Sequence, residues 1–299
     1  MSNRSEIIID PRFRSGFFLQ GPDPVKDQRI NFTYLDYEKK AILPSRKVWI
    51  LSQWWTPYDF KNAGFSEDET SFRYYNESRE LIIDRESGEL TMALDSYKEY
   101  QKRLGHSREK TSDPWSHFLL EQDFYHPLRF RKLQAFLARL DFTIDSVEAE
   151  DTEHYDPNIH AAQFLWYLTI GEMKGTEEEN PLEDKYIWLG IPIYDNRYPM
   201  VKGSQNIDEG FSGATNTLIY TLGSDIFLSK PIQFGKDYSI DIDLLPYIKK
   251  SVRYAIKKGI FTSEKKLYVN YMNIGWELPG SFRVKSRIRN LRLEAISDE

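Results

Sequence analysis

Strict alternation of apolar and polar residues is the feature that most constrains the fold of this chain. In residues 134–145 every second side chain is apolar, and the residues between are mostly charged or polar. Residues 161–170, 185–194 and 267–278 follow the same period, with turn residues such as Gly, Pro, Asn and Asp between the segments. This pattern is typical of strands with one face in a core. The sequence therefore predicts a mostly β protein, a two-sheet antiparallel β-sandwich of the jelly-roll kind.

One helix and one irregular strand stand out from this pattern. Apolar residues recur at helical spacing over 244–258, Asp243 is a suitable N-cap, and Gly259 can take the left-handed conformation that ends a helix. In the last predicted strand, 282–293, the apolar residues change parity, which predicts a β-bulge near Asn290.

Length and composition limit the domain count and exclude some classes of function. No repeat or linker divides the 299 residues, so we expect one domain over 1–299, with loop insertions in the polar stretches 58–70, 105–116, 150–159, 171–184 and 196–214. The chain has no Cys, which excludes disulfides and thiolate chemistry. A net charge of −6 argues against a nucleic-acid partner.

The apolar runs bear on where the protein resides. No run approaches the length of a membrane span, and the first residues lack the apolar core of a signal peptide. These features predict no membrane partner and a cytoplasmic protein as the sequence stands. A secreted chain whose signal had been trimmed would look the same.

The strand faces opposite the predicted core are unusually rich in aromatic and amide residues. The chain has 19 Tyr, 18 Phe and 7 Trp, and aromatic rings can stack on the apolar faces of sugars while amides and carboxylates bind their hydroxyls. If the strands share a sheet, the predicted ligand-binding residues are Arg139, Gln163, Tyr167, Tyr186, Trp188, Tyr271 and Asn273, with Trp55 from the cluster at 52–60. The alternative is that an insertion covers this face and makes it a second core.

Paired carboxylates are the second candidate feature, because glycoside cleavage normally needs two. Asp141 and Glu277 both fall on the predicted wet faces, and we expect them to be the catalytic pair if the protein is an enzyme. The acidic run 148–153 is more typical of a solvated loop.

Histidines and a basic strand offer weaker signals. His117 and Glu121 share parity and, with His160, could form a metal or general-base site, but no close His pair supports this, so no metal or cofactor is predicted. Alternation puts a basic stripe on one side of the last strand, either for anionic sugars or as the protection of an exposed edge. Its members are Arg283, Lys285, Arg287 and Arg289.

Several strands resemble those of known carbohydrate-binding sandwiches. The segments LYVNYMNIGWELPGSF and VKSRIRNLRLEA resemble the closing strands of jelly-roll carbohydrate-binding modules. AAQFLWYLTI and KYIWLGIPIYD are similar to strands of concanavalin-like lectin, glucanase and lyase sandwiches. The likeness covers mainly residues 134–295 and implies a concave sheet that binds saccharide. The acidic run 148–153 also looks like the motif of laminarinase-type glycosidases, but Glu150 stands where that family has Asp, so no family catalytic residue is carried over.

Three functional hypotheses follow. The first is carbohydrate binding on an aromatic-lined sheet face, with an oligo- or polysaccharide as partner. The second is a glycoside hydrolase or polysaccharide lyase that uses the same face. The third is a protein–protein interaction module whose aromatic face meets another polypeptide or a second copy of the chain. The sequence leaves the choice between enzyme and binding protein open.

Overall fold

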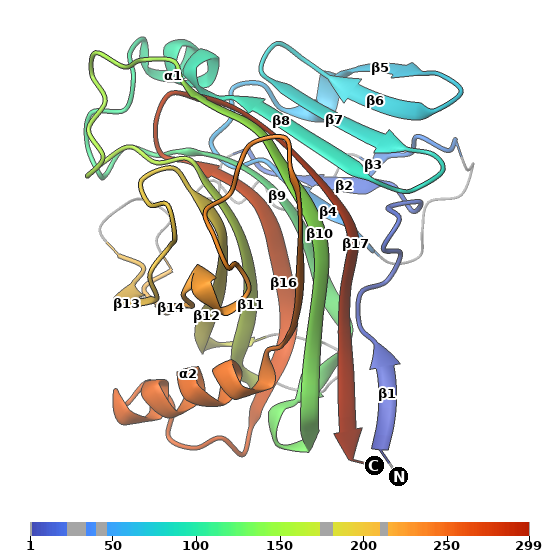
Figure 1. The fold of residues 1–299 in the computed structure, drawn as a ribbon, viewed down its shortest axis with the longest axis vertical. Coiled ribbons are helices and arrows are strands. Elements are labelled where there is room, and N and C mark those ends of the chain that lie inside the picture. Colours follow the sequence, from blue (N-terminus) through green and yellow to red (C-terminus); the bar gives the residue numbers. More distant parts are fainter. Residues whose placement is uncertain (1, 23–33, 40–46, 174–181, 210–214, 299) are drawn as a thin grey trace.

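Two β-sheets form the molecule in a computed structural model that describes residues 2–22, 34–39, 47–173, 182–209 and 215–298 (Figure 1). In the eight-stranded sheet, sheet A, the order is β15-β10-β17-β8-β7-β6-β5, and β1 also pairs with β17. Its strands are β1 (Ser2–Glu6), β5 (Gly64–Glu67), β6 (Ser71–Tyr75), β7 (Arg79–Asp84), β8 (Leu90–Asp95), β10 (Leu133–Ala149), β15 (Asp237–Asp243) and β17 (Phe282–Asp298).

The nine-stranded sheet, sheet B, has the order β13-β14-β12-β11-β16-β9-β4-β2-β3. Its pairings are antiparallel except β12–β14 and β2–β4, which are parallel. Its strands are β2 (Phe17–Gln20), β3 (Tyr34–Leu35), β4 (Ile50–Ser52), β9 (Ser116–Arg129), β11 (Gln163–Met173), β12 (Leu182–Asp195), β13 (Ser204–Ile207), β14 (Leu218–Thr221) and β16 (Leu267–Leu278). The predicted two-sheet sandwich is confirmed.

A single apolar core lies between the sheets, and its members follow the predicted parity. Phe136, Leu140 and Ile144 of β10 are buried, and so are Trp166 of β11 and Trp276 of β16. These residues belong to one contiguous cluster drawn from both sheets. The alternation of the sequence therefore predicts the core face of these three strands correctly.

Two α-helices accompany the sheets in the described ranges. Helix α2 (Leu245–Lys257) lies where the periodicity predicts it, the Asp243 carboxylate accepts a hydrogen bond from Leu245 N–H (3.0 Å), and Gly259 has φ 75°. Helix α1 (Ser96–Leu104) was not predicted, because it follows β8 directly and most of its residues are polar. No helix of the described ranges is long and apolar enough to cross a membrane.

The predicted bulge and loops have mixed outcomes. Asn290 has φ 53°, and the β10–β17 register shifts opposite it, which confirms the bulge. Two stretches expected to be loops contain short strands, since β5 lies within 58–70 and β13 within 196–214. In Figure 1 both termini lie at one end of the molecule, and strands β5–β8 lie at the other.

The basic stripe on β17 serves neither predicted purpose. Strand β17 is an interior strand between β10 and β8, so it is not an exposed edge. The three arginines of the stripe pair with acids: Arg283 with Glu150, which follows β10 (3.1 Å), Arg287 with Asp145 of β10 (3.0 Å), and Arg289 with Asp237 of β15 (3.0 Å). These pairs cross-link the outer face of sheet A and do not leave the arginines as a site for an anionic ligand.

Candidate functional site

Seven of the predicted binding and catalytic residues share the face of sheet B that points away from the core, here named the aromatic face. The strand register places Tyr167 opposite Asn273 and Gln163 opposite Glu277, and Thr169 between Trp188 and Tyr271. The members of the aromatic face are Gln163, Tyr167, Tyr186, Trp188, Tyr271, Asn273 and Glu277. Strands β11, β12 and β16 are neighbours, so parity alone brings these side chains to one surface.

The catalytic pair predicted from the sequence, Asp141 with Glu277, is wrong. Asp141 lies on β10 in sheet A, and its carboxylate accepts hydrogen bonds from Ser239 (2.6 Å) and Asn290 (2.6 Å). Arg139 shares that strand face and pairs with Asp241 (3.2 Å). Both side chains face away from the core on the opposite side of the sandwich, so neither belongs to the aromatic face.

Trp55 lies beside the aromatic face rather than on it. Trp55 occupies the turn after β4 with φ 62°. Its N–H donates to the Pro22 carbonyl (2.6 Å), and its carbonyl accepts a hydrogen bond from the Arg103 side chain. The preceding residue, Trp54, accepts a hydrogen bond from the backbone of His117 (3.1 Å), so this turn borders the start of β9.

Trp188 is the centre of an aromatic cluster on this face. Its ring lies edge-to-face with the rings of Tyr167 (5.7 Å between centroids), Tyr186 (5.7 Å) and Tyr271 (5.8 Å). All four residues are half-buried. The face is therefore neither sealed as a second core nor fully open, and its rings are held rigidly by one another.

Glu277 has the most unusual environment of the charged residues on the face. Its side chain is 17% exposed, and Trp115 Nε1 donates to Oε2 (3.3 Å). The pKa of Glu277 is raised to about 7, mainly by burial and to a smaller extent by the negative charge of Asp208, while the Trp115 hydrogen bond acts in the opposite direction. At neutral pH this carboxyl is thus available both as a proton donor and as a proton acceptor.

Next to Glu277 lies a neutral histidine. His117 Nε2 is 3.7 Å from Glu277 Oε2, but burial lowers the pKa of His117 to about 3. The contact is therefore not an ion pair at neutral pH. The imidazole also stacks on the Trp115 ring (5.4 Å), so Trp115 and His117 together form one wall beside the carboxyl.

Asp208 is a second carboxylate near the site that the sequence did not single out. It follows β13, and its Oδ2 accepts hydrogen bonds from Thr215 N–H (2.8 Å) and Thr215 Oγ1 (2.6 Å). Its charge raises the pKa of both Glu277 and Tyr167. Asp208 was missed because it belongs to a segment read as a loop, where no periodicity shows which way a side chain points.

At the other end of the face, Glu121 is buried opposite Asn273 in the register. Tyr271 hydrogen-bonds to both Glu121 and Asn273. The Oδ1 atom of Asn273 is buried and has no hydrogen-bond partner within the part of the chain that the structure describes. An unpaired buried acceptor is costly, so this atom is an unsatisfied polar group on the aromatic face.

The histidine-based metal site considered from the sequence does not assemble. His160 is buried at the end of the sandwich, where Asp156 N–H donates to its Nδ1 (2.9 Å) and its Nε2 donates to the Arg108 carbonyl (2.6 Å). Both ring nitrogens are therefore occupied. Among the described residues, no group of three His, Asp or Glu side chains could hold a metal ion.

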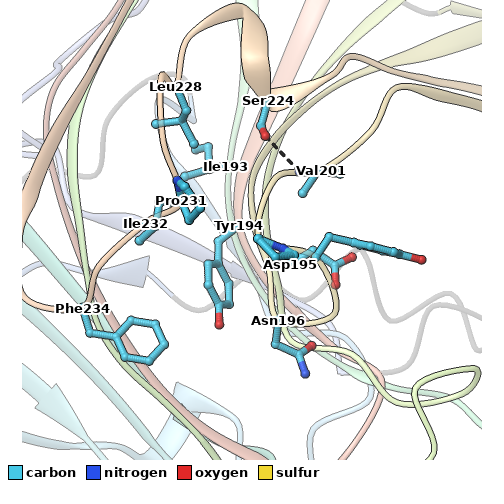
Figure 2. Close-up of a pocket in the computed structure, with 12 residues that line it drawn as sticks. Ile193, Tyr194, Asp195, Asn196, Val201, Ser224, Leu228, Pro231, Ile232 and Phe234 are labelled. Atoms are coloured by element: carbon cyan, nitrogen blue, oxygen red, sulfur yellow. Dashed lines mark hydrogen bonds between the residues drawn. The ribbon is translucent and has the colours of Figure 1, made fainter.

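A cavity of about 210 Å³ adjoins the end of β12. Figure 2 shows Tyr194 and Phe234 on one side of it and Asp195 and Asn196 on the other. No member of the aromatic face lines the cavity, but Asp195, which does, lies opposite Gln163 in the β11–β12 register.

Neither a protein-family model nor a curated protein sequence matches the chain. Among solved structures it is similar to endoglucanase Cel12A of Rhodothermus marinus, with 11% identity and a TM-score of 0.41 over 79% of this chain and 97% of that chain. It is also similar to endoglucanase 3 of Trichoderma harzianum, from family GH12, with 8% identity and a TM-score of 0.41 over 83% and 98%. For the xyloglucanase domain of NopAA from Sinorhizobium fredii, solved in complex with cellobiose, the identity is 9% and the TM-score 0.38 over 80% and 100%.

These neighbours belong to the glucanase-type sandwiches that the strands resemble in sequence. With so little identity and TM-scores below 0.5, they add nothing on function, which has to be inferred from the side chains of this chain.

Proposed function

We propose that the chain is a glycoside hydrolase that binds an oligo- or polysaccharide on the aromatic face and uses Glu277 as its proton donor. The observation that carries this proposal is the position of Glu277: a half-buried carboxyl on the same sheet face as Trp188, Tyr167 and Asn273, with Asp208 close enough to act on it. Aromatic rings and amides bind sugars, and the carboxyl pair supplies the chemistry.

The different environments of Glu277 and Asp208 indicate which carboxyl has which catalytic role. Cleavage of a glycosidic bond needs an acid that protonates the leaving oxygen and an ionised carboxylate that activates water or attacks the sugar. Glu277 holds its proton near neutral pH, which suits the acid. Asp208, hydrogen-bonded to Thr215, is then the carboxylate of the pair. Glu121 lies on the same face, opposite Asn273 and in contact with Tyr271, so it is assigned to ligand binding.

The test is a panel of cello-, xylo-, laminari- and chito-oligosaccharides assayed for binding by calorimetry and for cleavage by release of reducing ends. We expect at least one sugar to be bound and cleaved by the wild type. Glu277→Gln should then reduce kcat by about 100-fold or more with little change in affinity, because removing general acid catalysis costs about 10²–10⁴-fold.

Trp188→Ala provides the complementary variant, because its effect should be on affinity. Deletion of the ring at the centre of the cluster should weaken binding about ten-fold or more. Failure of every sugar to bind, or cleavage that Glu277→Gln leaves unchanged, would refute the hydrolase. Binding without cleavage by the wild type would instead favour a carbohydrate-binding protein.

A further inference from the structure

A row of polar side chains runs across four neighbouring strands of the aromatic face, with one residue from each strand. Asp195 of β12 lies opposite Gln163 of β11, Gln163 lies opposite Glu277 of β16, and Glu277 lies opposite His117 of β9. Residues directly opposite one another on one face have Cβ atoms about 5 Å apart. Gln163 therefore stands directly beside the proposed proton donor.

Asp195 is held in place by a bidentate ion pair. Arg197 Nε donates to Oδ1 (2.9 Å) and Arg197 Nη2 to Oδ2 (2.7 Å), and the Arg197 backbone N–H also donates to Oδ1 (3.0 Å). The Asp195 residue is 2% exposed. Such a fork has one geometry, so the carboxylate has little freedom to turn.

This fixed carboxylate determines how the Gln163 amide is oriented. Gln163 Nε2 donates to Asp195 Oδ2 (2.9 Å). An ionised carboxylate only accepts hydrogen bonds, so the reversed amide, with its oxygen toward Asp195, would place two acceptors against each other. The Gln163 Oε1 atom is consequently on the side away from Asp195, and it has no hydrogen bond to any described residue.

We propose that Arg197 and Asp195 are positioning residues that hold the Gln163 amide with its carbonyl oxygen toward the ligand, where it accepts a hydrogen bond from a sugar hydroxyl next to Glu277. The ligand contact depends on the proposed function, whereas the orientation of the amide does not. Nothing in the sequence alone pairs Gln163 with Asp195, because 32 residues separate them.

The experiment is a double-mutant cycle read by calorimetry with the tightest-binding oligosaccharide of the panel above. Asp195→Asn and Gln163→Ala should each weaken binding about ten-fold, the loss expected for one hydrogen bond in the site. In the Gln163→Ala background, Asp195→Asn should have no further effect, because Asp195 acts only through Gln163. Additive losses would overturn the proposal.

A second measurement follows the amide directly and needs no ligand. In NMR spectra of the free protein, the Gln163 side-chain NH₂ should be rigid in the wild type and become mobile in Asp195→Asn. Arg197→Lys keeps the positive charge but loses the bidentate ion pair, so it should also increase the mobility of the Gln163 NH₂. This variant replaces Asp195→Asn in the experiment if Asp195→Asn does not fold. The control is Asp145→Asn, which breaks a matched Asp–Arg pair on the outer face of sheet A. It should leave the mobility of the Gln163 NH₂ unchanged.

The two readouts separate the possible failures. An amide that is equally mobile in the wild type and Asp195→Asn overturns the positioning role whether or not sugars bind. A rigid amide in a protein that binds no sugar of the panel supports the positioning by Asp195, while the proposed function and the ligand contact both fail.

Discussion

At the scale of single residues, burial decides which groups on the aromatic face carry a charge. The pKa of Glu277 is about 7 in the folded chain and near 4.5 when unfolded, so the folded state holds its proton more tightly. The stabilising contribution is therefore complete below about pH 4.5 and is lost as the pH rises through about 7. Glu277→Gln, which mimics the protonated acid, should remove this dependence.

We expect Glu277→Gln to be more stable than the wild type by about 2 kcal/mol at about pH 9, with the full linkage value reduced for solvent screening. At about pH 4 the two proteins should have the same free energy of unfolding. Urea denaturation at both pH values measures the difference. Equal stability at both would show that Glu277 has an ordinary pKa.

The influence of Asp208 on Glu277 gives a second prediction. Because its negative charge raises the pKa of Glu277, Asp208→Asn should lower that pKa. An NMR titration of the Glu277 side-chain carboxyl carbon in both proteins measures the shift without any substrate. Asp237→Asn, on sheet A, is the control that should leave it unchanged. A pKa that stays the same in Asp208→Asn would separate the two carboxyls and remove Asp208 from the proposed pair.

The members of the site that the sequence predicted are those on regular strands. Gln163, Trp188 and Asn273 were found because parity fixes the direction of a strand side chain. Trp115 and Asp208 were not, because they lie in segments without a period, where only tertiary structure determines the direction of a side chain.

At the scale of whole elements, parity shows which face of a strand is wet but not which sheet the strand joins. Arg139 and Asp141 lie on the outer face of their strand, as their parity predicts. They do not belong to the aromatic face, because β10 pairs with β15 and β17 in sheet A. Strand order depends on long-range pairing, which a local pattern does not contain. The sandwich and the core could therefore be predicted from the sequence, and the composition of the face only in part.

The pairing of β9 with β16 depends on a glycine. Gly275 has φ 153°, and an added Cβ would overlap the Phe118 carbonyl oxygen on β9. Gly275→Ala should lower the free energy of unfolding by about 3 kcal/mol and impair any activity, because Glu277 is two residues away. Gly105→Ala is the matched control: its φ is 78° but nothing lies near the new methyl group, so it should cost only about 1 kcal/mol. Equal losses in chemical denaturation would contradict this.

A buried ion pair joins α1 to β7, and its arginine also contacts the start of β9. Arg79 Nε donates to Glu99 Oε1 (2.6 Å), both side chains are fully buried, and Arg79 Nη1 donates to the His117 carbonyl (2.8 Å). Glu99→Gln leaves the Arg79 charge uncompensated, so we expect a loss of about 3–5 kcal/mol in denaturation experiments. Glu67→Gln, which breaks the exposed pairs of Glu67 with Lys39 and Arg85, should cost less than about 1 kcal/mol. A similar small loss for Glu99→Gln would mean that water reaches Arg79.

At the scale of the whole molecule, the buried apolar residues form one cluster that runs from β7 through both sheets to β12. Because this cluster is contiguous among the described residues, we propose that the chain unfolds as one domain. Leu81 of β7 and Ile191 of β12 are both fully buried in this cluster. Leu81→Ala and Ile191→Ala should each cost about 2–5 kcal/mol. In a single domain, each should lower the midpoint of one calorimetric transition whose van't Hoff and calorimetric enthalpies agree. Two independent domains would instead show two transitions, with each variant shifting only its own.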